Sequence, residues 1–154
     1  MAEKAQQRAN PFKSSMNLSQ LSMSIWSDLA PVRQLSLPVI QYFVAQVAAQ
    51  VTHRTKTKGQ LSAQSISREL ENEGINWSNK KILRVADALK TLLISYMAAY
   101  KADDPAETRQ TLVDEITSRS CIQKEEIVEA LAGAIDTEAS EAHSFDTVTS
   151  LMRL

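Results

Sequence analysis

A long apolar stripe between Asn76 and Tyr100 constrains the fold of this chain more than any other feature. Its apolar residues recur at the helical period at Ile82, Val85, Ala86, Leu89, Leu92, Leu93, Tyr96, Met97 and Tyr100. This spacing puts them on one side of an α-helix of about seven turns. Because the stripe is wide and mostly aliphatic, we expect this helix to be the central pillar of a packed bundle.

The composition favours an all-α fold. The 154 residues include only three Gly and four Pro, and no segment shows the Val, Ile and Thr alternation of a strand. This length suits one domain. We therefore predict a compact helical bundle of five to seven helices over residues 16–154. Residues 1–15 form a polar tail that is either flexible or bound to a partner.

Shorter apolar stripes predict the other helices of the bundle. They cover residues 15–29, 38–52, 61–73, 105–118 and 122–135, and a last short helix from residue 140 onward. Gly74 suits the C-cap of one helix, and Asp104 followed by Pro105 is a strong start for another. Ser36 suits an N-cap, and Ser78 or Asn76 caps the central helix.

The first predicted helix carries side chains that suit a partner groove, because Trp and Met are common anchors at protein interfaces. The predicted partner-binding residues are Met16, Leu18, Leu21, Met23, Ile25 and Trp26. The alternative is that this segment packs on its own bundle, and the sequence leaves both interpretations open.

Two stretches are rich in cations. The predicted basic patch consists of Arg54, Lys56 and Lys58 in a loop, and of Lys80, Lys81 and Arg84 near the start of the central helix. Such a patch suits phosphate or an acidic partner. Residues 61–90 also fit a helix-turn-helix, which makes a nucleic-acid-binding protein the alternative function. The apolar second helix and the acidic second half of the chain argue against this alternative.

Charge is distributed unevenly along the chain. Residues 1–101 carry 13 Lys or Arg and 6 Asp or Glu, a net charge of +7. Residues 102–154 carry 4 Lys or Arg and 12 Asp or Glu, a net charge of −8. This layout indicates either contact with a protein of matching charge or neutralisation between the early and late helices.

The sequence lacks the motifs of catalysis and metal binding. The histidines, His53 and His143, have no ligand-spaced partner, and Cys121 has no acid or base nearby. Phosphate-cradling glycine loops are also missing. We therefore expect no enzyme activity, no cofactor, no metal and no small-molecule substrate. An enzyme would need two or more of Asp87, His53, Cys121 and Glu115 to converge in a cleft.

The location is predicted from what the chain contains. A single cysteine indicates a reducing compartment, and no stretch approaches the roughly 18 apolar residues of a membrane span. Residues 1–15 lack the apolar core of a secretion signal. We expect a cytoplasmic protein.

The order of these features resembles the N-terminal helical domain of the COMM-domain proteins. That domain has a short leading helix, a long aliphatic helix, a short helix ending in a polar or Gly turn, and a helix with spaced acids and leucines. The matching stretches are residues 35–43 (LSLPVIQYF), 66–70 (ISREL), 82–93 (ILRVADALKTLL), 112–116 (LVDEI) and 122–131 (IQKEEIVEAL).

The chain departs from that family after Leu131. The family's C-terminal β-rich module, with its Trp-Arg strand signature, is absent, because no strand-like segment and no Trp follow. The resemblance implies a non-enzymatic subunit of a multiprotein assembly, such as those of endosomal recycling, without assigning its partners. The residues and the resemblance together predict a protein–protein interaction module that acts as an adaptor or structural subunit, with other protein chains as partners.

Overall fold

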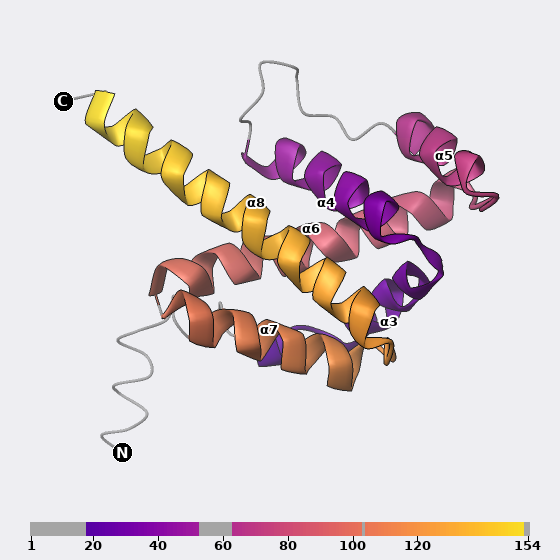
Figure 1. Cartoon of the computed structure of the whole chain (residues 1–154), viewed down its shortest axis with the longest axis horizontal. Coiled ribbons are helices and arrows are strands. Elements are labelled where there is room, and N and C mark those ends of the chain that lie inside the picture. The colour runs from indigo at the N-terminus through magenta and orange to yellow at the C-terminus, as the bar shows by residue number, and fades with distance from the viewer. Residues whose placement is uncertain (1–17, 53–62, 103, 153–154) are drawn as a thin grey trace.

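The computed structural model describes residues 18–52, 63–102 and 104–152, and describes side chains for residues 18–51, 63–101 and 104–144. Over these residues the chain is all-α and has no β-strand, which confirms the predicted fold class (Figure 1). The elements are η1 (Leu18–Gln20), α3 (Met23–Leu29), η2 (Ala30–Gln34), α4 (Leu37–Thr52), α5 (Ala63–Asn72), α6 (Asn79–Ala102), α7 (Pro105–Arg119) and α8 (Glu125–Met152).

The central pillar is α6. It packs against α3, α4, α5, α7 and α8, and α4 and α8 cross in front of it in Figure 1. Nine of its side chains are buried, among them Leu92 and Tyr96, which are fully hidden from solvent. Met97 and Tyr100 are partly buried and pack against the same core. The predicted role of this helix is therefore confirmed.

The segment before α4 differs from the prediction of one helix over residues 15–29. It forms η1, a separate helix α3, and then η2, a 3-10 helix that contains Pro31 in its first turn. Proline is accepted there because its missing N–H has no partner in the first turn of a helix. Ser22 starts α3, and its hydroxyl accepts a hydrogen bond from the Ser24 N–H.

The turn after α5 has the geometry predicted for Gly74. Gly74 has a φ of 75°, which glycine adopts without the steric cost of a Cβ. The N–H of Ile75 donates to the Leu70 carbonyl at 2.9 Å, and the N–H of Gly74 donates to the Glu71 carbonyl at 2.9 Å. These two hydrogen bonds form a Schellman motif, which ends the helix.

Two of the three predicted N-caps, Asp104 and Ser78, are formed. Asp104 accepts hydrogen bonds from the N–H groups of Ala106 and Glu107, as predicted for the start of α7. The Ser78 hydroxyl accepts from the Lys81 N–H at 3.1 Å at the start of α6. Ser36 precedes α4, but its hydroxyl donates to Glu73 at 2.7 Å instead of capping, and so ties α4 to the end of α5.

The prediction of a separate last helix from residue 140 is wrong. α8 runs without a break from Glu125 to Met152. Residues 136–140 contain neither Pro nor Gly, and Ala139 and Ala142 are buried and continue the contact side of Ile135. The small alanine side chains carry little apolar signal in the sequence, although both are buried and Ala139 belongs to the hydrophobic core.

Candidate functional site

The outward side of α6 is the described surface that best combines exposed apolar and basic side chains. We define the α6 outer face by Lys80, Leu83, Arg84, Lys90 and Ile94. Leu83 is 45% exposed and Ile94 is 40% exposed, although α6 packs against α3, α4, α5, α7 and α8. The two residues are three turns apart, so they project in nearly the same direction.

The cations of the α6 outer face are not neutralised by the bundle. Lys80, Arg84 and Lys90 form no ion pair with any residue that the structure describes. The first turn of α6 also contains no acidic residue. The N-terminus of a helix carries a partial positive charge, which adds to the charges of Lys80 and Arg84 at this end of α6.

A shallow groove between α3 and α6 continues this basic surface. Its volume is about 350 Å³, and its lining includes Lys80, Lys81 and Arg84 beside Asp28 and Pro31. Lys81 is also held by Trp77, because its Nζ lies 4.8 Å from the centre of the buried indole ring. The structure thus brings together one half of the predicted basic patch. The other half, Arg54, Lys56 and Lys58, lies outside the described residues.

The predicted partner-binding arm is largely packed on its own bundle. Leu18 and Trp26 are buried in the core, so they are not available as surface anchors in this conformation. Leu21 and Ile25 are partly buried against the same core. Among the described residues of the predicted arm, only the Met23 side chain is mostly exposed to solvent, at 59%. Packing on the bundle, the alternative left open by the sequence, therefore applies to most of the arm. Met16 lies outside the described residues.

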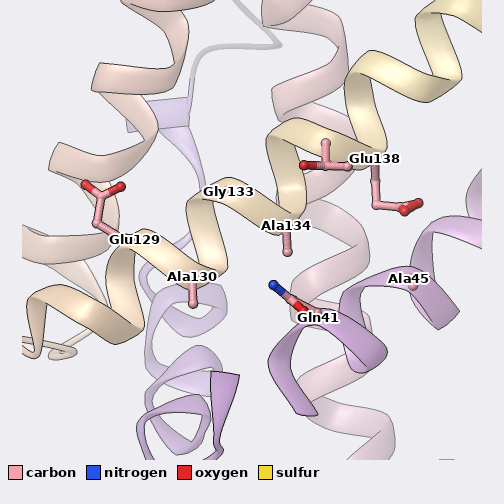
Figure 2. A pocket seen from close by; sticks show the side chains of 8 residues that line it. Gln41, Ala45, Glu129, Ala130, Gly133, Ala134 and Glu138 are labelled. Atoms are coloured by element: carbon pink, nitrogen blue, oxygen red, sulfur yellow. The ribbon is translucent and has the colours of Figure 1, made fainter. Parts of the chain in front are cut away.

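A second groove lies between α4 and α8 (Figure 2). It has a volume of about 470 Å³, and its lining includes the small residues Ala45, Ala130, Gly133 and Ala134. In Figure 2 the Gln41 amide points from α4 toward α8. Glu129 and Glu138 of α8 also line the groove, and Glu129 is paired with Arg109. No cation, histidine or cysteine lines it, so the lining gives no indication of a reaction or of a specific ligand.

The acidic second half of the chain partly neutralises itself. Arg109 of α7 pairs with Glu129 of α8 at 2.9 Å, and Arg119 pairs with Glu115 one turn away on α7. Both pairs use cations from the acidic half. Neither pair involves a cation of α6, so these two pairs do not neutralise Lys80, Arg84 or Lys90.

The four groups considered for catalysis are not brought together where the structure describes them. Neither of the two grooves is lined by Asp87, Glu115 or Cys121. Asp87 and Cys121 are exposed, and Cys121 sits at the junction after α7 with a φ of 63°. His53 lies outside the described residues. In the part of the chain that is described, no three His, Cys, Asp or Glu side chains are grouped to hold a metal.

Tyr96 has the most strongly shifted side-chain pKa among the described residues. Burial, together with the neighbouring Asp136 carboxylate, raises the pKa of its hydroxyl far above the ordinary value. Tyr96 is fully buried between helices and opens into neither groove. We therefore assign this hydroxyl to helix packing and not to a reactive site.

Within the described residues, none of the helices combines the length and apolar character that a membrane crossing requires. Comparison of the chain with protein-family models, with curated proteins and with solved structures gives no match. The resemblance to the COMM-domain proteins therefore stays a prediction from the sequence.

Sequence reasoning missed the apolar part of the candidate site. Leu83 and Ile94 were not part of the predicted stripe of α6, and Lys90 was not part of the predicted basic patch. A signal was present, because Leu83 and Ile94 are large apolar residues on the opposite side of the same helix from the stripe. These two residues form a second, exposed apolar strip, with Asp87 and Lys90 between them.

Proposed function

We propose that this chain is a non-enzymatic protein-interaction module, an adaptor or structural subunit of a multiprotein assembly. The α6 outer face is the docking surface in this proposal. The observation that carries it is the exposure of Leu83 and Ile94 on one side of the central helix. Single exposed apolar residues are ordinary. Two that project from the same side of one helix can both be covered by a single amphipathic helix of a partner.

The energetics of covering this strip support the proposal. Removing apolar surface from water contributes about 25 cal/mol for each Å². Leu83 and Ile94 lie about 16 Å apart along the helix axis, so a single partner helix can cover both. The basic side chains around them provide a polar rim, as is common at interfaces that form and dissociate.

Met23 is a smaller, second contact point in the proposal. Arg119 lies beside it, with its Nη1 3.7 Å from the Met23 sulfur.

The cytoplasmic location and the helix-turn-helix alternative also stay predictions. A nucleic acid would engage the cations of the α6 outer face but would leave Leu83 and Ile94 in water, which is why a protein partner is favoured.

The test is a pair of substitutions on the α6 outer face. Leu83→Ser with Ile94→Ser removes the apolar strip without opening the core. We expect the full chain carrying both substitutions to keep its helicity. On size-exclusion chromatography it should elute separately from the native assembly. Leu37→Ser is the matched control, because Leu37 is 41% exposed but lies at the start of α4. Retention of the double variant in the assembly would contradict the proposal.

A further inference from the structure

We infer that the α6 outer face binds an acidic amphipathic helix of its partner protein. This inference rests on the proposed function and names the chemistry of the segment that covers the surface. It follows from the charges that surround Leu83 and Ile94. The α6 outer face carries three cations, Lys80, Arg84 and Lys90, and the single carboxylate of Asp87 lies on the same side, so the surface that the apolar strip shares has a net positive charge.

The positions of these cations are unfavourable for the isolated chain. Lys80 and Arg84 are four residues apart on the same side of α6, where like charges repel each other. Both lie within the first two turns, at the positive end of the helix dipole. Neither has an ion pair within the described structure. A partner with carboxylates opposite these residues would relieve both effects.

The distribution along the helix matches an amphipathic partner. Lys80 and Arg84 flank Leu83 at one end of the strip, and Lys90 precedes Ile94 at the other. An acidic helix with apolar residues at a spacing of three and four places its apolar side on the strip. Its carboxylates then lie beside the cations at both ends. The three turns between Leu83 and Ile94 set the contact length at about 11 residues.

Asp87 lies on the same side of α6 and is exposed. It reduces the positive charge of the surface without removing it, because the same face carries three cations. An acidic partner must therefore place its carboxylates toward Lys80 and Arg84 and toward Lys90, and not at the centre of the strip. This requirement fixes where the carboxylates of a partner helix can lie.

The experiment identifies the segment directly. The photoreactive amino acid p-benzoylphenylalanine replaces Leu83 in one full-length variant and Ile94 in another, in the native cells. Mass spectrometry identifies the peptide that is crosslinked after irradiation. We expect both positions to reach one segment of another protein, with a net negative charge and apolar residues at helical spacing.

A synthetic peptide of the identified segment then tests the role of charge. Lys80→Glu with Arg84→Glu should weaken its binding by about tenfold or more at low salt. Lys124→Glu is the matched control, because Lys124 is exposed and precedes α8. Higher salt should lower the affinity of the wild-type protein for the peptide. The difference in affinity between the wild-type and the charge-reversed protein should then become smaller.

The outcomes separate this inference from the proposed function. A crosslinked segment that is neutral or basic, a crosslink to nucleic acid, or a crosslink to a second copy of this chain overturns the inference. So does equal binding of the peptide to the wild-type and charge-reversed proteins. If neither position yields a crosslink while the protein remains in its assembly, the proposed docking surface itself is wrong.

Discussion

The hydroxyl of Tyr96 donates a hydrogen bond to Oδ1 of Asp136 at 2.5 Å, and this contact joins α6 to α8 across 40 residues of sequence. Tyr96 is fully buried, and Asp136 is partly buried. A short hydrogen bond to a carboxylate is among the stronger kinds in proteins. The central pillar is therefore fixed to the longest helix by polar chemistry as well as by apolar packing.

Removal of this hydroxyl should destabilise the bundle. Tyr96→Phe leaves the partly buried Asp136 carboxylate without this donor, at a cost of about 2 kcal/mol. Urea denaturation followed by circular dichroism measures the change. Tyr42→Phe is the control, because Tyr42 is a partly buried tyrosine packed against the same core that makes no hydrogen bond through its hydroxyl in the described structure. Equal effects of the two substitutions would contradict the assignment.

The same hydroxyl should make the protein sensitive to alkali. Its pKa is raised in the folded state, mainly by burial, from an ordinary value of 10.0. Above that pH the unfolded chain releases a proton that the folded chain keeps, so stability falls by up to about 1.4 kcal/mol per pH unit. The stability advantage of the wild-type protein over Tyr96→Phe should therefore shrink above about pH 10. A gap that stays constant between neutral and alkaline pH would refute this.

Two glycines should respond to alanine in opposite ways. Gly74→Ala forces a side chain into a φ of 75° and should cost about 1 kcal/mol. Gly133 lies inside α8, where a Cβ would meet only the end of the Arg109 side chain at 3.9 Å. Gly133→Ala should therefore stabilise the chain by up to about 1 kcal/mol. Thermal unfolding of both variants checks the signs, and a stabilised Gly74→Ala would rule out the turn described here.

Cys121 occupies a position that favours glycine. It follows α7 with a φ of 63°, a left-handed conformation that costs other residues about 1 kcal/mol. Cys121→Gly should therefore raise the free energy of unfolding by up to that amount. Cys121→Ala keeps the backbone cost and should leave stability nearly unchanged. If the alanine variant gains as much as the glycine variant, the effect belongs to the thiol and not to the backbone.

The parts of the fold that depend on local signals could be predicted from the sequence. Gly74, Ser78 and Asp104 act within a few residues of themselves, and their roles were predicted correctly. The length of α8 could not be predicted, because the buried residues that continue its contact side, Ala139 and Ala142, are small and carry little apolar signal in the sequence. The left-handed backbone at Cys121 was equally hidden, since the usual signal for it is glycine.

The candidate site was predicted only in part. The cations Lys80, Lys81 and Arg84 stand out in the sequence and do come together beside α3. The burial of Leu18 and Trp26 depends on how the arm meets the bundle, which periodicity does not reveal. The sequence of an amphipathic arm shows the same apolar pattern whether its own domain or a partner covers it.

The most direct test of the central claim is hydroxyl-radical footprinting of the α6 outer face. Oxidation of Leu83 and Ile94 is measured in the isolated chain and in the native assembly, with Leu37 as the internal control of similar exposure. The account predicts that both residues are oxidised readily in the isolated chain and are protected several-fold in the assembly, while Leu37 changes little. Unchanged oxidation of Leu83 and Ile94 in the assembly would contradict it.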